Sequence, residues 1–134
     1  LPALQVAHLN VERLTPGRVQ LVCGDLLGWC RGRVDLILAN LPYLRPDEAH
    51  PGIAREPAGA LYAQGAGFAL YHELLRQAAL LLASGGAVGC EIGMEQGERA
   101  VREAGAFFPN AIIRVKRDLA GRDRYLLIED ACSA

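Results

Sequence analysis

Two short runs, residues 19–23 and 34–39, constrain the fold more than any other feature, because both are β-branched and almost wholly apolar. Strands of this composition are typical of parallel sheets, in which both faces are covered. The runs end where polar residues begin, at Asp25 and Asn40. We therefore predict two buried parallel strands, each followed by a polar side chain at its carboxyl end.

Segments with a helical period alternate with further apolar runs. Apolar residues recur at steps of three and four over residues 3–14, which predicts a helix that ends at Pro16-Gly17. The prolines and glycines of residues 41–66 exclude a continuous helix or a central strand, and loops of this length are usually functional or disordered. The rest of the chain predicts a helix over 68–83 ended by Gly85-Gly86, a buried strand over 87–92, a helix over 95–104, and an antiparallel hairpin of 111–117 and 124–129 around Gly121.

This alternation of strands and helices predicts an α/β doubly wound sheet with helices on both faces and a C-terminal antiparallel hairpin. A length of 134 residues with 51% hydrophobic composition suits one compact domain. Ligands bind such sheets at the carboxyl ends of the strands. Asp25 and Asn40 are therefore the first candidates for a functional site.

Composition disfavours several classes of function. A net charge of −1 without a Lys/Arg-rich block disfavours direct binding of nucleic acid and favours a protein or small-molecule partner. The cysteines lack metal-ligand spacing, so we expect no metal and a reducing compartment, with Cys23 and Cys90 buried in apolar strands. The longest apolar stretch, near 78–83, is far short of a membrane span, and no signal-peptide pattern is present. We expect a soluble, cytoplasmic protein without a membrane partner.

The tetrapeptide Asn40-Leu41-Pro42-Tyr43 follows the second apolar run and carries the clearest chemical signal. An amide nitrogen is a weak nucleophile, so an enzyme that methylates it must orient the NH2 group with hydrogen-bond acceptors. The Asn40 side-chain oxygen and the Leu41 carbonyl are such acceptors. Pro42 keeps Leu41 extended, and Tyr43 offers a flat face to a planar amide or base. The alternative interpretation is an ordinary Asn-x-Pro turn with Tyr43 in the core.

The tetrapeptide resembles the [DNS]-[PIL]-P-[YFW] motif of class I methyltransferases. The surrounding segments are similar to the release factor glutamine methyltransferase family over nearly the whole chain. In chain order, the matching residues are Pro2-Ala3-Leu4, Val6-Ala7, Asn10, Gly24-Asp25-Leu26, Glu56-Pro57, Ala60-Leu61, Gly65, Gly67-Phe68, Tyr71, Gly85-Gly86, Glu91-Ile92-Gly93, Gln96, Asp118, Gly121 and Arg124.

The resemblance implies S-adenosylmethionine-dependent methylation of a glutamine side-chain amide in the Gly-Gly-Gln loop of peptide chain release factors. It implies Asn40 and Tyr43 as catalytic residues. Transfer from a sulfonium donor needs little acid or base help, so the absence of an obvious base is no objection. The implied substrate-binding residues are Asn40, Leu41, Pro42 and Tyr43, and the implied cofactor-binding residues are Asp25, Leu26 and Asn40.

Two departures from the family pattern qualify these expectations. Leu41 stands where glutamine-modifying members more often have proline, and the Leu form is familiar in ribosomal RNA adenine dimethyltransferases. The sequence also lacks a glycine-rich loop after a first strand and the acidic residue that holds the cofactor ribose. We expect residues 1–134 to form a partial class I methyltransferase domain that lacks the first two strands. It would be a fragment of a longer protein, or a rearranged sheet in which 19–23 and 34–39 pair directly, with poor cofactor affinity.

Other polar residues carry weaker signals. Asp25 could instead cap a turn, and Glu56 could either position substrate or remain solvated. Glu91 lies in an apolar run, so we expect it to brace the strand-end loops by accepting hydrogen bonds. His8, His50 and His72 lack ligand or triad spacing and are expected to be solvated or packing residues.

Two other functions remain open from the sequence. An adenine exocyclic-amine methyltransferase acting on RNA or DNA would use Asn40 and Tyr43 on a flipped base, although the charge disfavours it. A cofactor-free fragment that acts only as a folded interaction module would fit the missing glycine-rich loop. Titration with the cofactor distinguishes the last possibility from the enzymes.

Overall fold

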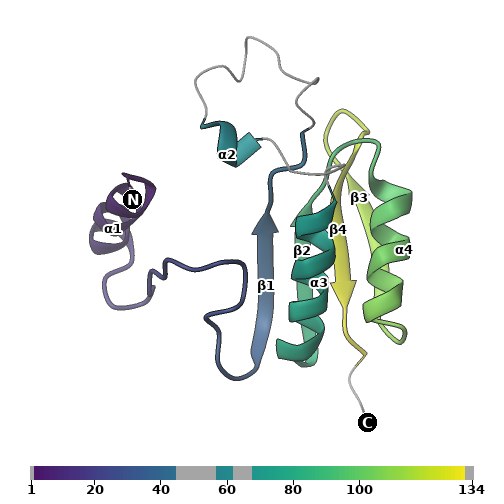
Figure 1. Ribbon diagram of the computed structural model, residues 1–134, viewed down its shortest axis with the longest axis horizontal. Coiled ribbons are helices and arrows are strands. Elements are labelled where there is room, and N and C mark those ends of the chain that lie inside the picture. The colour runs from purple at the N-terminus through teal and green to yellow at the C-terminus, as the bar shows by residue number, and fades with distance from the viewer. Residues whose placement is uncertain (1, 45–56, 62–67, 132–134) are drawn as a thin grey trace. The chain divides into compact units, whose positions relative to one another are not determined.

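The computed structural model describes residues 2–44, 57–61 and 68–131. The chain divides into two compact units, Leu1–Cys30 and Arg31–Ala134, and each is described by itself. The described residues include no helix long and apolar enough to span a membrane. Figure 1 shows the helices and strands of both units with their labels.

Helix α1 (Pro2–Leu14) is the main element of the first unit and confirms the helix predicted over residues 3–14. The Thr15 N–H continues the helical pattern to the Val11 carbonyl at 2.9 Å. The turn that follows contains Gly17 at φ 72°, a left-handed conformation that glycine adopts without a steric cost. No residue of α1 is buried, so this helix builds no core of its own.

The strand predicted over residues 19–23 is wrong. These residues form no strand, and none of the described strands pairs with them. Their apolar side chains are exposed, and so is Cys23, contrary to the prediction of a buried thiol. An extended backbone becomes a strand only where a neighbour satisfies its N–H and C=O groups, and apolar composition does not supply that neighbour. Direct pairing of 19–23 with 34–39 is therefore wrong as well.

The second unit contains a four-stranded sheet in the order β1-β2-β4-β3. Strand β1 pairs with β2 in parallel, whereas β4 is antiparallel to both β2 and β3. The predicted C-terminal hairpin is thereby confirmed. The four strands are β1 (Val34–Asn40), β2 (Leu82–Glu91), β3 (Ile112–Arg117) and β4 (Asp123–Glu129).

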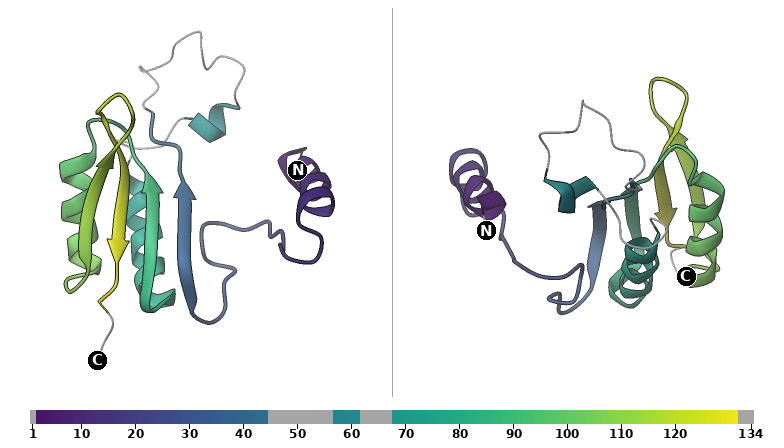
Figure 2. Two further views of the ribbon diagram at one scale, coloured as in Figure 1. Left: turned by 180° about the vertical axis from the view of Figure 1, so that it is seen from behind. Right: turned by 45° about the horizontal axis from the view of Figure 1, so that its top comes forward.

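Helices α3 (Ala69–Leu81) and α4 (Gly97–Phe107) lie on the same face of this sheet (Figures 1 and 2). They confirm the predicted helices, with each end displaced by one to three residues. Helix α2 (Ala58–Leu61) is a single turn within the segment predicted to be a loop. Helix cover on the second face of the sheet stays a prediction.

The core lies between the sheet and the two long helices. Buried strand residues alternate with more exposed ones, as one-sided burial of a pleated sheet requires. From β1, β2 and β4 the core receives Ile37, Val88, Cys90, Leu126 and Ile128, and from α3 and α4 it receives Tyr71, Leu74, Leu75, Ala78, Ala100 and Ala104. Cys90 is buried as predicted.

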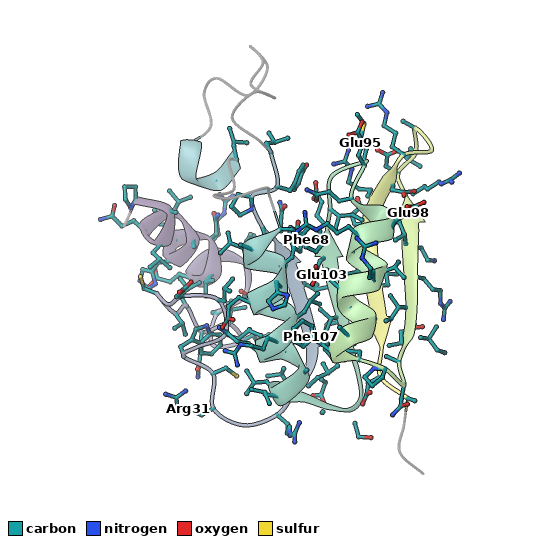
Figure 3. All side chains as sticks on the ribbon, turned by 45° about the vertical axis from the view of Figure 1, so that its right-hand side comes forward. Arg31, Phe68, Glu95, Glu98, Glu103 and Phe107 are labelled. Atoms are coloured by element: carbon teal, nitrogen blue, oxygen red, sulfur yellow. The ribbon has the colours of Figure 1, made fainter. Side chains whose placement is uncertain are left out.

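Polar and aromatic side chains also join α3 to α4. His72 lies 3.0 Å from a Glu103 carboxylate oxygen and meets the Phe107 ring edge-on. Figure 3 labels Glu103 and Phe107 on α4. The Arg99 guanidinium lies 4.6 Å from the centre of the Phe68 ring, a cation–π contact. His72 is therefore a packing residue, as the sequence predicts.

The end of α3 differs from the prediction that Gly85-Gly86 stop the helix. The helix ends at Leu81, and Leu82 already has extended geometry while its N–H still bonds the Ala78 carbonyl. Leu82 pairs with Val34, and Arg33 donates to the Leu82 carbonyl at 2.9 Å. These contacts draw Leu82 into β2, and the register shifts before Ala87 resumes regular pairing.

Among the described residues, strand β1 is buried on one face, and cover of its second face stays a prediction. Ile37 is buried, whereas Leu36 and Leu38 are 59% and 75% exposed. Helices α3 and α4 lie on one face of the sheet (Figure 2), and the exposed Leu36 and Leu38 alternate with the buried Ile37 along the strand.

Candidate functional site

The candidate site begins where β1 ends. Asn40 is the last residue of β1 and lies opposite Glu91, the last residue of β2, in the parallel ladder. Asn40 is exposed, whereas Leu41, Pro42 and Tyr43 are half-buried. The tetrapeptide therefore leaves the sheet at the carboxyl end of its parallel pair, where open α/β sheets bind ligands.

Tyr43 is held at its hydroxyl group. The hydroxyl donates to Glu91 Oε1 at 3.1 Å and accepts a hydrogen bond from Arg124 Nη1 at 3.0 Å. The same Arg124 nitrogen lies 3.6 Å from Glu91 Oε1, which closes a triangle of three groups. Glu91 on β2 and Arg124 on β4 thus fix the hydroxyl end of the Tyr43 side chain.

The pKa of the Tyr43 hydroxyl follows from these contacts. Burial raises this pKa above its ordinary value of 10.0, the Glu91 carboxylate raises it further, and Arg124 opposes the rise. The hydroxyl therefore stays protonated at neutral pH. It can then donate to Glu91 while it accepts from Arg124.

Tyr43 is also held at its backbone. Gln96 Nε2 donates to the Tyr43 carbonyl at 3.5 Å, and Gln96 Oε1 accepts from the Gly93 N–H at 3.0 Å. A Cβ at Gly93 would lie 3.4 Å from Tyr43 Cδ2 and closer still to Gln96, so a side chain there would press on both. The next residue, Leu44, donates its N–H to the Leu61 carbonyl at 3.0 Å.

Glu91 itself is anchored from the core. The Tyr71 hydroxyl donates to the Glu91 backbone carbonyl, and Ile92 donates its N–H to the Arg124 carbonyl at 2.8 Å. The Glu91 side chain is 30% exposed, so it lies at the edge of the core. As the sequence predicts, Glu91 braces the strand ends by accepting hydrogen bonds.

The turn between β3 and β4 positions Arg124. Asp118 Oδ1 accepts from the backbone N–H groups of Ala120 and Arg122, and Asp118 Oδ2 lies 3.6 Å from Arg124 Nη2. The Arg122 N–H is the main group that lowers the pKa of Asp118 below its usual range. Gly121 has φ 77°, which this tight turn requires. A charged chain of contacts therefore runs from the hairpin turn to Tyr43.

Asp25 and Leu26, the predicted adenine-binding residues, belong to the first unit, whereas Asn40 belongs to the second. Asp25 accepts the Gly28 N–H at its backbone carbonyl, and the Leu26 carbonyl accepts from the Trp29 indole at 2.9 Å. Asp25 is exposed. Leu26 has φ 44°, an uncommon backbone geometry for a leucine.

The residues predicted to bind S-adenosylmethionine would serve only part of that molecule. Asp25 and Leu26, in the first unit, would serve its adenine, and Asn40, in the second unit, its methyl end. The sequence contains no glycine-rich loop or ribose-binding acid to complete the set. Glu56 and His50 lie outside the described residues. Among the residues that are described, no cluster of three or more His, Cys, Asp or Glu side chains could hold a metal ion.

Sequence reasoning matched Gln96, Asp118 and Arg124 to a family pattern but gave them no role. The structure joins all three to Tyr43, directly or through one another. The sequence contains a signal for Arg124, because an arginine in an apolar strand is unusual and needs hydrogen-bonding partners. The identity of those partners depends on contacts between distant segments.

The sheet order and the loop at the end of its parallel pair agree with the fold of class I methyltransferases. Among solved structures, the chain is similar to the release factor-specific protein-(glutamine-N5) methyltransferase from Alicyclobacillus acidocaldarius, with a TM-score of 0.51 and 21% identity over 96% of this chain and 60% of that one. It is also similar to TrmN from Thermus thermophilus, with a TM-score of 0.62 and 22% identity over 96% of this chain and 33% of that one. At these identities the likeness shows the fold alone.

Curated relatives narrow the class, although no protein-family model matches the chain. The release factor glutamine methyltransferase of Enterococcus faecalis is 32% identical over 95% of this chain and 47% of the relative. That of Moorella thermoacetica is 39% identical over 93% of this chain and 46% of the relative. The chain belongs to the release factor glutamine methyltransferase family. It spans about half the length of the curated relatives it matches.

Proposed function

We propose that the protein containing this chain methylates a glutamine side-chain amide in the Gly-Gly-Gln loop of a peptide chain release factor, with S-adenosylmethionine as the methyl donor. The main support is the position of Asn40-Leu41-Pro42-Tyr43 at the carboxyl end of β1, opposite the end of β2. Membership of the family supports a release factor glutamine as the substrate, because the curated members are named release factor glutamine methyltransferases.

Asn40 and Leu41 have the acceptors that this reaction needs. The Asn40 side-chain oxygen and the Leu41 carbonyl would accept hydrogen bonds from the two hydrogens of the glutamine NH2 group. Pro42 restricts Leu41 to extended geometry, which aims its carbonyl. The Tyr43 ring would pack against the planar amide. Replacement of the usual proline by Leu41 leaves this mechanism intact, because the acceptor is a backbone carbonyl.

Orientation is the principal contribution of these residues. When bound, S-adenosylmethionine supplies a methyl group already activated by the sulfonium charge. The amide nitrogen must then be held in line and close to that carbon, so fixed acceptors contribute more than a strong base. Asp25 and Leu26 are proposed to line the adenine pocket, and Asn40 to lie near the methyl group.

The test uses the full-length protein, S-adenosylmethionine and a purified release factor, with mass spectrometry of the Gly-Gly-Gln peptide. We expect one added methyl group on the glutamine, and loss of most of this activity in Asn40→Ala. Asn110→Ala, an exposed asparagine next to Pro109 at the other end of the sheet, should retain full activity. An unmodified glutamine in the presence of active cofactor binding would contradict the proposal.

The same preparation distinguishes the alternatives. Methylation of an adenine in RNA or DNA, with no change in the release factor, would support the nucleic-acid methyltransferase. Failure of the full-length protein to bind S-adenosylmethionine in isothermal titration would support a folded module without enzyme activity. Binding to the full-length protein but not to the 134-residue chain would fit the missing glycine-rich loop.

A further inference from the structure

We propose that Arg124 and Glu91 are positioning residues that hold Tyr43, and through it the loop that presents Asn40 to the substrate amide. This inference rests on the proposed function for its catalytic consequence. The contacts that carry it lie within the second unit and can be tested without any methylation assay.

The Tyr43 hydroxyl uses both of its hydrogen-bonding roles inside the protein. Its single proton goes to Glu91 Oε1 at 3.1 Å, and its oxygen accepts the Arg124 Nη1 proton at 3.0 Å. A phenol bound on both sides has one favoured orientation. We call the Tyr43 hydroxyl and its two partners, Glu91 and Arg124, the clamp. Because both partners hold the hydroxyl, the ring is the part of Tyr43 left to contact a substrate.

The clamp is better shielded than an ordinary surface ion pair. The side chains of Arg124, Glu91 and Asp118 are 21%, 30% and 24% exposed. Ion pairs on exposed surfaces contribute little because water and salt screen them, whereas partly buried groups with several hydrogen bonds are screened less. The second Arg124 nitrogen faces Asp118, so the guanidinium is fixed at two points and cannot easily turn away from Tyr43.

Fixing Tyr43 also restricts Asn40, because only two residues separate them. Pro42 removes much of the freedom of the intervening backbone, and Gln96 holds the Tyr43 carbonyl. On the other side of Leu41 and Pro42, Asn40 is fixed as the last residue of β1. The Leu41 carbonyl, which is the proposed second acceptor, thus lies between two fixed ends.

The first test measures the clamp directly in the 134-residue chain by NMR titration of the Tyr43 ring, assigned with Tyr43→Phe. Arg124→Met should raise the pKa of Tyr43, because it removes the positive neighbour that opposes the rise. Glu91→Gln should lower it, because it removes a negative neighbour. Arg124→Lys should restore part of the change, and Arg114→Met, which removes an arginine paired with Glu129 on the same hairpin, should leave it unchanged.

The second test measures catalysis in the full-length protein. Arg124→Met should lower kcat roughly 10- to 100-fold, as misplacement of a reacting group does, with little change in the dissociation constant of S-adenosylmethionine. Arg124→Lys should recover part of the loss, and Arg114→Met should match the unmodified protein. Assays are run well below each variant's unfolding temperature, so that a fall in stability alone does not change kcat.

The outcomes separate the two proposals. A Tyr43 pKa that is unmoved by both Arg124→Met and Glu91→Gln overturns the clamp, whether or not the protein methylates glutamine. A moved pKa with unchanged kcat in Arg124→Met also overturns the positioning role and leaves a purely structural link. Absence of glutamine methylation in the unmodified full-length protein overturns the proposed function, while the Tyr43 titration still decides whether the clamp exists.

Discussion

The Tyr71 hydroxyl on α3 donates a hydrogen bond to the backbone carbonyl of Glu91 at the end of β2. Tyr71 is fully buried, and its ring stacks on Phe68 with the ring centres 5.0 Å apart. Tyr71→Phe keeps the stacked ring and removes only the hydroxyl. We expect a loss of about 1–3 kcal/mol in the free energy of unfolding, because a buried acceptor loses its partner. Urea denaturation followed by circular dichroism measures it.

Tyr125→Phe is the matched control for Tyr71→Phe. Tyr125 lies on β4 and is 44% exposed, so water can replace any partner that its hydroxyl loses. The free energy of unfolding should change by less than about 0.5 kcal/mol. Equal effects of the two substitutions would mean that the Tyr71 bond does not stabilise the end of β2.

Alkaline pH should destabilise the fold through buried acids. Burial raises the pKa of the Cys90 thiol from 9.0 to about 12, and burial likewise raises the pKa of Tyr71 above its ordinary 10.0. The folded chain then keeps protons that the unfolded chain releases. Their contribution to stability is fully present below pH 9 and is lost as the pH rises toward the folded-state pKa values. The urea midpoint should therefore fall between about pH 9 and pH 11.

Cys90→Ala separates the thiol from the phenols in this pH series. The variant should be less stable at every pH because it removes a buried side chain. Its urea midpoint should nevertheless fall less steeply than that of the unmodified chain, since one of the protons retained on folding is gone. A midpoint that stays constant up to about pH 11 in the unmodified chain would contradict the prediction.

Gly86 and Gly105 should respond to alanine in opposite directions. A Cβ at Gly86 would lie 2.9 Å from both the Ala83 and Asp35 carbonyl oxygens, and backbone atoms cannot move aside cheaply. Gly86→Ala should therefore cost about 1–3 kcal/mol in the free energy of unfolding. Gly105 lies in α4 with nothing within 4 Å of its added Cβ, so Gly105→Ala should gain about 0.5–1 kcal/mol. Thermal unfolding of both variants checks the pair, and a gain for Gly86→Ala would disprove the close approach.

The periodicity of apolar residues predicts those helices and strands whose burial pattern can be seen within their own sequence. Helices α1, α3 and α4 and the β3–β4 hairpin follow from apolar spacing and turn residues, because these signals lie within the element itself. The run at residues 19–23 has the same apolar character but no partner among the described strands. The end of α3 at Leu81 also depends on a distant partner. Leu82 pairs with Val34, so the helix ends before the glycines are reached.

The candidate site was predictable in part for the same reason. Asn40 and Tyr43 could be placed because Asn40 ends a recognisable strand and Tyr43 follows shortly after it. The clamp on Tyr43 could not, since Tyr43 and Arg124 are 81 residues apart and belong to different strand ends. Only the three-dimensional pairing of β1 with β2 and of β2 with β4 brings these groups together.

Neighbouring residues of β1 give the sharpest test of its one-sided burial. Ile37 is 6% exposed and Leu38 is 75% exposed, although both are large aliphatic residues of one strand. Threonine keeps strand propensity at either position. Ile37→Thr should cost about 2–4 kcal/mol in the free energy of unfolding, because it leaves a cavity and buries a hydroxyl group. Leu38→Thr should cost less than about 1 kcal/mol, since its contact with Gly89 covers only part of the side chain.

Urea denaturation of the two threonine variants in the 134-residue chain decides this prediction. Ile37 is buried in the core, so its substitution leaves a cavity there. Leu38 lies beside Gly89 in the parallel ladder and is exposed. Equal losses at the two positions would mean that other parts of the chain cover the second face of β1 in solution. A small loss at Leu38 together with a large loss at Ile37 would support a sheet buried on one side only.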